Sequence, residues 1–204
     1  MAATAYGPGV EWLLPLLAFG FVCTVTPGPN NVLLWASAAA FGVRRTWPHV
    51  VGTALGVGLL GLLVAAGLGV LITTVPPLAF AMKLGGSIYL LYLAWQVAGA
   101  GALQRTTAAR PMGLIQAIAF QLVNPKVWIF ALGAMATFRP ASLPVALGSV
   151  LVAIVMMAVA IPSSALWAVG GEAIDRLIER PSTRRAVSLT LAILVVATVA
   201  LVWI

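Results

Sequence analysis

Charged residues are scarce in this chain. Only 7% of its 204 residues are Asp, Glu, Lys or Arg, whereas 62% are hydrophobic and the mean hydropathy is +1.11. A soluble domain of this length could not bury so much apolar surface, so a soluble globular protein is excluded and the surrounding solvent is lipid. The composition therefore predicts an all-α integral membrane protein, folded as a single transmembrane domain over residues 1–204.

The residue types that build most catalytic and metal sites are equally scarce. The chain has one cysteine, Cys23, and one histidine, His49, so it can form no internal disulfide and offers no Cys/His metal cluster. Its apolar segments contain no pair of acids and no phosphate-binding glycine loop. These absences argue against a membrane enzyme, and no metal or cofactor is expected. We interpret Cys23 as a small buried hydrophobic residue and His49 as an interfacial one.

Six apolar segments are expected to span the membrane: 10–37, 49–73, 79–101, 113–137, 143–169 and 187–204. Because residues 1–10 carry no charge, the first segment is expected to be a retained helix rather than a signal peptide.

Basic residues are distributed unequally between the connections of these segments. The first, third and fifth connections hold eight arginines, whereas the other side has only Lys83 and Arg139. The eight are Arg44, Arg45, Arg105, Arg110, Arg176, Arg180, Arg184 and Arg185. This bias predicts a cytoplasmic-membrane protein with both termini outside. It also explains the net charge of +7 by membrane orientation, so no binding of nucleic acid is expected.

Two polar breaks that contain proline interrupt the apolar sequence. The first reads Thr26-Pro27-Gly28-Pro29-Asn30-Asn31, and the second reads Asn124-Pro125-Lys126. Proline removes a backbone donor and clashes with the preceding turn, so neither segment can continue as a regular helix. Backbone groups freed inside a membrane are tolerated where they are buried in protein or line a cavity, so the breaks predict a binding site.

Each break has the chemistry to bind a small charged group. Asn30 is expected to cap the half-helix after the first break, and Asn124 the one after the second, with Pro125 at its first position. The free N–H groups of both half-helices would attract a carboxylate, and the asparagine carboxamides can contact either charge. The predicted substrate-binding residues are Pro27, Gly28, Pro29, Asn30, Asn31, Asn124, Pro125 and Lys126.

Lys126 is the one charged residue that falls well inside an expected span. A charge in the membrane is costly, so the favoured hypothesis is functional: Lys126 binds a substrate carboxylate or takes part in proton coupling. The alternative is that its side chain snorkels, or pairs with a backbone carbonyl near a helix end.

The positions of the breaks suggest an internal repeat. One break lies in the first segment and the other in the fourth, three segments later. Because three is odd, the second half enters the membrane from the opposite side, which is typical of inverted-topology repeats with a site near the mid-plane. We expect two three-helix repeats, over about 10–101 and 113–204.

Glycines in the second segment predict close helix packing. Gly52 and Gly56 share one helix face, which lets another helix approach closely. Packing within the chain is favoured, and a homodimer is the alternative.

Three motifs together resemble the LysE/RhtB family of amino-acid exporters. They are the first break, the stretch Lys83-Leu84-Gly85-Gly86-Ser87-Ile88-Tyr89-Leu90-Leu91-Tyr92-Leu93, and Leu122-Val123-Asn124-Pro125-Lys126. The resemblance covers nearly the whole chain and implies a six-helix inner-membrane exporter of amino acids or related small metabolites, driven by the proton gradient. Many relatives carry an acid at the position of Val57. Because this chain lacks that acid, a lysine-like substrate is not favoured, and the residue that carries the proton is not identified.

The favoured function is therefore secondary transport. A small zwitterion would bind between the breaks and be exported by alternating access, with the substrate, membrane lipid and protons as partners. The alternative is a membrane scaffold or assembly factor without transport activity, although the sequence lacks the large loops that would favour it.

Overall fold

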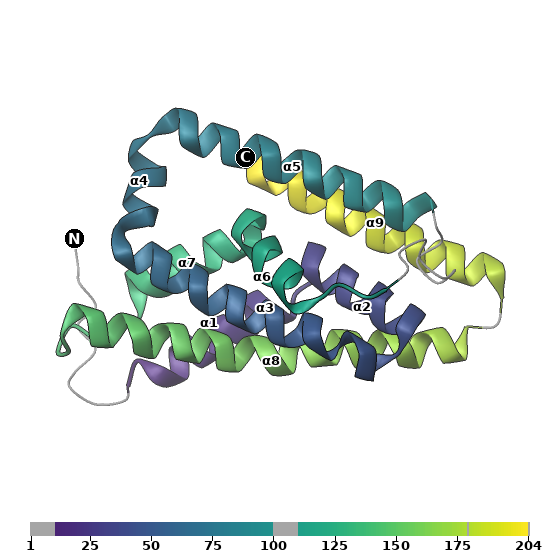
Figure 1. The fold of residues 1–204 in the computed structure, drawn as a ribbon, viewed down its shortest axis with the longest axis horizontal. Coiled ribbons are helices and arrows are strands. Elements are labelled where there is room, and N and C mark those ends of the chain that lie inside the picture. Colours follow the sequence, from purple (N-terminus) through teal and green to yellow (C-terminus); the bar gives the residue numbers. More distant parts are fainter. Residues whose placement is uncertain (1–10, 100–109, 179, 204) are drawn as a thin grey trace.

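The computed structural model describes residues 11–99, 110–178 and 180–203, and these parts of the chain form a bundle of helices (Figure 1). A π-helical turn, η1, interrupts the second apolar segment. In chain order the elements are α1 (Leu13–Val25), α2 (Pro29–Phe41), α3 (Val43–Leu63), η1 (Val64–Leu68), α4 (Gly69–Thr74), α5 (Pro76–Gly99), α6 (Leu114–Val123), α7 (Pro125–Thr137), α8 (Val145–Leu177) and α9 (Pro181–Trp203).

The helix lengths agree with a membrane protein. Among the described residues, three stretches are long and apolar enough to cross a membrane by themselves: Val43–Leu71, Val145–Ile174 and Ser182–Ala200. Two more spans arise if α1 with α2, and α6 with α7, each count as one bent span. The third expected segment, 79–101, corresponds to α5, whose apolar part, Ala79–Trp95, is shorter. The predicted all-α membrane class is confirmed, with three to five spans by length and composition.

Both predicted breaks are present. The axes of α1 and α2 are bent by 61°, and those of α6 and α7 by 73°. Pro29 and Pro125 each begin the second half-helix, where the missing proline N–H would have no partner within the helix. Asn124 caps α7 as predicted, because its Oδ1 accepts from Lys126 N at 3.2 Å. The predicted cap by Asn30 is wrong: Gly28 is the N-cap of α2, without a side-chain cap.

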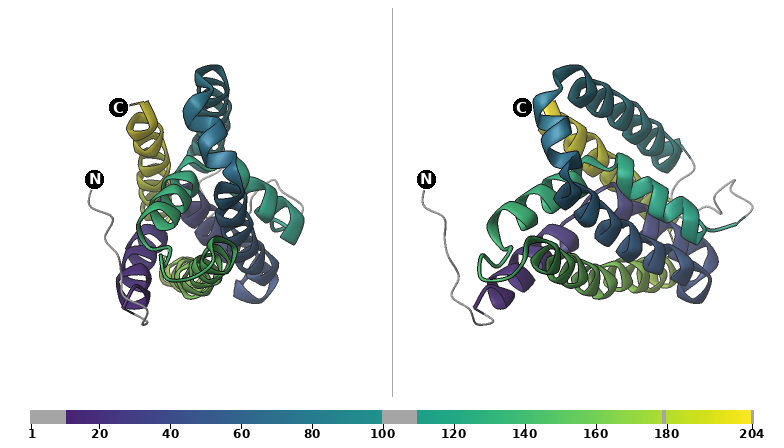
Figure 2. Two further views of the ribbon diagram at one scale, coloured as in Figure 1. Left: turned by 90° about the vertical axis from the view of Figure 1, so that its left-hand side faces the viewer. Right: turned by 60° about the vertical axis from the view of Figure 1, so that its left-hand side comes forward.

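The helices gather around two main hydrophobic clusters. One contains Leu16 of α1, Leu60 of α3, Phe130 of α7 and Met156 of α8. The other joins α2 and α6 to α5 and α9, and Figure 2 shows α5 and α9 running side by side, away from α8. Each bent span therefore passes from one cluster to the other at its break. An inverted repeat would produce this pattern, and the repeat itself stays a prediction.

The glycines of α3 form a close helix contact within the chain. A Cβ added at Gly52 would lie 2.5 Å from the Leu114 carbonyl oxygen, and one at Gly56 would lie 2.7 Å from Gln121 Cγ. Only glycine lets the backbones of α3 and α6 come this close. The predicted packing within the chain is confirmed for these two residues, and the homodimer stays untested.

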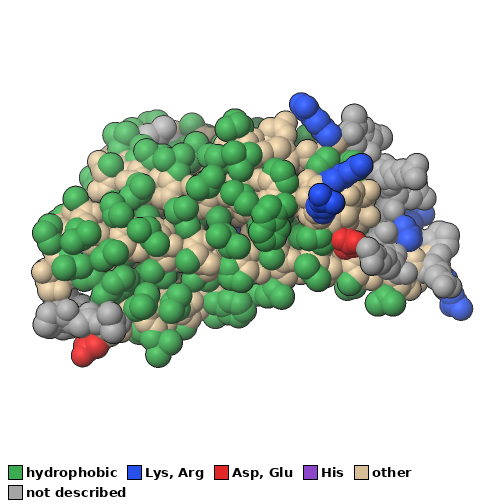
Figure 3. All heavy atoms as spheres, turned by 60° about the horizontal axis from the view of Figure 1, so that its bottom comes forward, with side chains coloured by type: hydrophobic (Ala, Val, Ile, Leu, Met, Phe, Trp, Pro, Cys, Tyr) green, Lys and Arg blue, Asp and Glu red, His purple; other side chains and the backbone are tan. Residues whose placement is uncertain are grey.

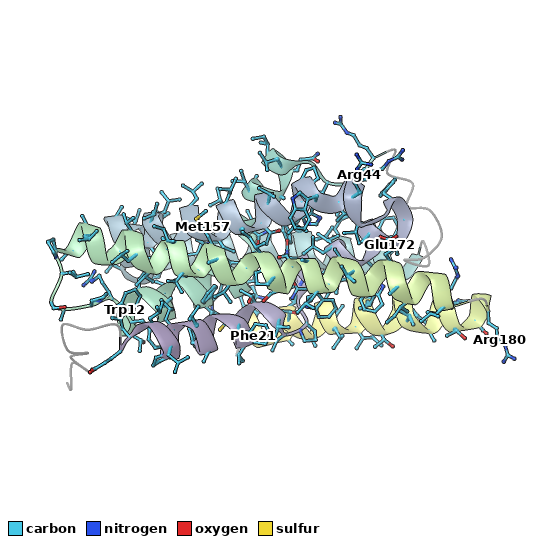
Figure 4. The ribbon with its side chains drawn as sticks, turned by 90° about the horizontal axis from the view of Figure 1, so that it is seen from below. Trp12, Phe21, Arg44, Met157, Glu172 and Arg180 are labelled. Carbon is cyan, nitrogen blue, oxygen red and sulfur yellow. The ribbon has the colours of Figure 1, made fainter. Side chains whose placement is uncertain are left out.

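Basic side chains concentrate at one end of the bundle. In the view of Figure 3 they lie near one end, while hydrophobic side chains cover most of the remaining surface. Figure 4 places Arg44, Glu172 and Arg180 toward this end and Trp12 at the opposite one. At the same end, Val43 N donates to Glu172 Oε2 at 2.7 Å. Of the eight arginines, Arg105 lies outside the described residues.

Candidate functional site

The first break frees four backbone carbonyls at the end of α1. Carbonyls at a helix end have no partner within the helix, and lipid offers none either. Side chains from α2, α7 and α8 fill this need. Asn31 Nδ2 donates to the carbonyls of Thr24 at 2.7 Å and Thr26 at 2.9 Å. Trp167 Nε1 donates to the carbonyl of Val25 at 2.9 Å. Lys126 Nζ donates to the carbonyls of Thr26 at 2.6 Å and Pro27 at 3.3 Å.

Lys126 connects the second break to the first. Its backbone lies in the first turn of α7, and its ammonium reaches the C-terminal end of α1. This end of a helix carries a partial negative charge, which favours a cation. The side chain passes close to Gly28, where an added Cβ would lie 2.9 Å from Lys126 Cδ. The carbonyl pairing considered as the alternative role of Lys126 is thus present in this structure.

A chain of buried side-chain hydrogen bonds also joins the breaks. Asn30 Oδ1 accepts from Gln121 Nε2 at 2.8 Å, and Gln121 Oε1 accepts from Asn124 Nδ2 at 3.4 Å. All three side chains are buried. Buried polar groups are costly unless paired, so this arrangement stabilises one relative position of the two bent spans.

Asn30 is the centre of this network. Its Oδ1 also accepts from Thr53 Oγ1 at 3.1 Å and lies 3.3 Å from His49 Nε2, so two residues of α3 converge on it. The carboxamide that sequence reasoning assigned to the cap of α2 instead ties α2 to α3 and α6. Close by, Thr24 and Ser163 share a hydrogen bond of 2.7 Å that ties α1 to α8.

A small cavity lies between the breaks, with a volume of about 40 Å³. Polar side chains from both breaks and apolar side chains from α3, α7 and α8 line it. Five predicted site residues line it: Gly28, Asn30, Asn31, Asn124 and Lys126. The three prolines do not: Pro29 and Pro125 begin α2 and α7, and Pro27 lies in the gap between α1 and α2. A water molecule needs at least about 10–15 Å³, so the cavity has room for a few waters but not for an amino acid. We refer to this arrangement, in which the cavity is too small for an amino acid, as closed.

Sequence reasoning missed several residues of the cavity and network, above all Gln121 and Thr53. A signal for Gln121 existed, because it is a polar residue three positions before Asn124 in an apolar segment. The side chain of His49 is fully buried against Asn30, which sequence reasoning did not predict; its interpretation as interfacial stays a prediction. Cys23 is only half-buried and lines the cavity, which corrects its interpretation as a buried hydrophobic residue.

Comparison with known proteins identifies the family. Residues 21–203 match the family model described as LysE type translocator. The chain belongs to this family. Similar proteins include the cysteine/O-acetylserine efflux protein of Escherichia coli strain K12, 27% identical over 179 residues, which are 87% of this chain and 90% of that protein.

The protein of the same name from Klebsiella pneumoniae subsp. pneumoniae is 29% identical over 166 residues, which are 79% of this chain and 82% of that protein. No solved structure matches the chain.

Membership in the LysE type translocator family has direct consequences. Members are transporters rather than enzymes, which confirms the prediction against an enzyme. Family membership and the apolar helices together identify the chain as a multi-pass protein of the inner membrane. The family implies transport of a small molecule such as an amino acid.

Proposed function

We propose that this translocator exports a small zwitterionic amino acid, of the size of cysteine or O-acetylserine, by alternating access of the site between the two breaks. The observation that carries the proposal is the meeting of both broken spans at one cavity that polar side chains from both breaks help to line. The substrate class comes from the relatives named cysteine/O-acetylserine efflux proteins.

The two breaks offer partners for both charges of a zwitterion. The carbonyl end of α1 favours a cation, and the N-terminal ends of α2 and α7 favour an anion. In the closed structure the Lys126 ammonium is held by the carbonyls of Thr26 and Pro27. We infer that the substrate ammonium replaces it there and that Lys126 turns to the substrate carboxylate.

The cavity walls favour a small neutral side chain. Besides the network residues, the lining includes Val57, Phe130 and Ala160, and no acid is among the lining residues described. A second positive charge on the substrate would therefore find no carboxylate partner, which disfavours a lysine-like substrate. The hydroxyls of Thr24 and Ser164 and the thiol of Cys23 provide polar contacts for a short polar side chain.

Transport requires the cavity to widen. Because each bent span links the two hydrophobic clusters, movement of one cluster against the other changes the angle at both breaks together. Such rocking would open the site to the cytoplasm and to the outside in turn. Exchange of the substrate for protons would drive net export.

The test uses purified protein in vesicles loaded with labelled cysteine or O-acetylserine. We expect Asn30→Ala and Asn124→Ala to lower efflux at least tenfold, because each removes a buried partner of the network. Thr137→Ala, an exposed position at the end of α7, is the matched control and should match the original protein. Unchanged efflux in both asparagine variants contradicts the site, and no amino-acid efflux by the original protein favours the scaffold alternative.

A further inference from the structure

His49 is a buried ionisable residue next to the site that the proposed function does not yet use. Its side chain has 0% exposure and lies behind Asn30 rather than on the cavity wall. The ring Nε2 lies 3.3 Å from Asn30 Oδ1. The ring Nδ1 is buried without a hydrogen-bond partner among the described residues. Buried polar atoms are almost always paired, so an unpaired one calls for an explanation.

The network determines which ring nitrogen carries the hydrogen. Gln121 Nε2 donates to the Ala117 carbonyl at 3.1 Å, which fixes the orientation of the Gln121 amide. The same nitrogen donates to Asn30, so the Asn30 atom that faces His49 is an oxygen. An amide oxygen only accepts, so His49 Nε2 carries the hydrogen and Nδ1 keeps a free lone pair.

We propose that His49 carries the proton of proton-driven export, and that it binds this proton at Nδ1. The inference rests on the proposed function, since a proton gradient must drive net export. A proton that enters from outside forms a bond to the Nδ1 lone pair and gives the imidazolium. Release of the same proton to the cytoplasm restores the neutral ring, so protons move inward as substrate moves outward.

The closed arrangement couples this proton to conformation. Protonation would turn Nδ1 into a buried donor with no acceptor and add a charge to a fully buried ring. Both effects are costly, so the closed arrangement disfavours the imidazolium. By linkage, proton binding favours an arrangement in which Nδ1 reaches water or an acceptor. Binding of the proton thus biases the opening of the site.

The charged groups around His49 leave it free to release the proton. The elements packed most closely against α3 are α2, α6, α7, α8 and η1, and the sequences of α2, α6 and η1 contain no ionisable residue. From α7 comes Lys126, held by the α1 carbonyls. The α8 helix contributes Glu172, whose carboxylate accepts a hydrogen bond from Val43 N. Asp175 and Arg176 also belong to α8, but their side chains are not among those that the structure describes.

On α3 itself, Arg44 and Arg45 are exposed. Among the side chains described, none of these charged groups forms a hydrogen bond or ion pair with His49. No counter-charge among the described side chains therefore holds the proton on the ring.

The position of His49 along α3 suits release toward one side. The helix starts at Val43, six residues before His49, at the end of the bundle where Arg44 lies (Figure 4). At 1.5 Å per residue, His49 lies about 9 Å inside that end. It therefore stands between the arginine-rich end and the cavity, along the route that a proton would take to the cytoplasm.

The test separates exchange from proton-driven transport in vesicles. His49→Gln keeps an amide donor toward Asn30 but cannot bind a proton at neutral pH. We expect His49→Gln to keep measurable exchange of labelled cysteine across the membrane without a pH gradient. Accumulation driven by a pH gradient should fall to equilibration, and a pH-sensitive dye should show no coupled proton movement. Trp47→Phe, an exposed position two residues away, is the control and should keep both activities.

Two results for His49→Gln contradict the assignment, and two results for the original protein contradict its premises. Gradient-driven accumulation by His49→Gln at the original level would show that another group carries the proton. Loss of exchange together with accumulation would show that His49 only supports the site. If the original protein exchanges substrate but shows no response to a pH gradient, proton coupling itself fails. If it transports no amino acid at all, the proposed function fails.

Discussion

Replacing Lys126 with Met tests the role of the charge at the second break. Methionine keeps most of the volume of the side chain but removes the ammonium that donates to Thr26 and Pro27. We expect Lys126→Met to fold and to lose affinity for the substrate carboxylate.

The effect on stability is expected to be small because two contributions oppose each other. Hydrogen bonds that involve a charged group contribute about 1.5–3 kcal/mol each, and the one to Pro27, at 3.3 Å, is long. Against this loss, a lysine near the centre of a spanning helix costs about 2.5–3.5 kcal/mol to insert. The Thr26 carbonyl also keeps its bond from Asn31. The melting temperature in detergent should therefore change little.

The effect on binding is expected to be large. Loss of one charge-assisted contact to the substrate carboxylate, about 1.5–3 kcal/mol, corresponds to about 10- to 150-fold weaker binding. The assay compares binding of the amino acid with binding of its methyl ester, which lacks the carboxylate charge. The original protein should prefer the acid, and Lys126→Met should lose this preference. Lys83→Met, an exposed lysine of α5, is the control.

An equal preference for the acid in Lys126→Met and the original protein would refute the reasoning. Lys126 would then be only a structural partner of the α1 carbonyls.

Three further changes test the surroundings of the site. In Gly28→Ala the new Cβ would displace the Lys126 side chain. We therefore expect the preference for the amino acid over its methyl ester to fall by about two- to tenfold, which is less than in Lys126→Met. Gly52→Leu should destabilise the fold by at least about 1–3 kcal/mol in thermal unfolding, because α3 and α6 must separate, whereas Gly85→Ala, with open space around it, should not. In a background without Cys23, Ser182→Cys should react in intact cells only with membrane-permeant reagents, since we predict a cytoplasmic position; reaction from outside would invert the topology.

Local chemistry explains which features of the fold could be predicted from sequence. Proline disfavours the helix before it, and at Pro29 and Pro125 it directly follows Gly28 and Asn124, so the local sequence marks both breaks. Proline alone is not sufficient, because Pro48 and Pro162 lie inside α3 and α8. Asn124 lies directly before a proline, which is a local capping pattern, and the structure contains that cap. The apolar segments follow from composition in the same way.

The features that could not be predicted depend on contacts between distant helices. Asn30 was expected to cap its own helix, but α3 and α6 bring Thr53 and Gln121 to its carbonyl oxygen. His49 is fully buried because α3 lies between α2, α6 and α8, which hydropathy around Pro48 does not reveal. The partners of the α1 carbonyls come from positions up to 142 residues away in sequence.

The central claim, that substrate passes between the two breaks, can be tested most directly with the native thiol of Cys23. This residue is the only cysteine of the chain, is half-buried and lines the cavity. The measurement is the rate of Cys23 alkylation by a small maleimide in vesicles, with and without saturating O-acetylserine, which has no thiol to consume the reagent. Ser182→Cys in a Cys23→Ser background is the control for reagent access. The account predicts that substrate slows alkylation of Cys23 severalfold and leaves the control unchanged. Equal rates with and without substrate, while transport proceeds, would contradict it.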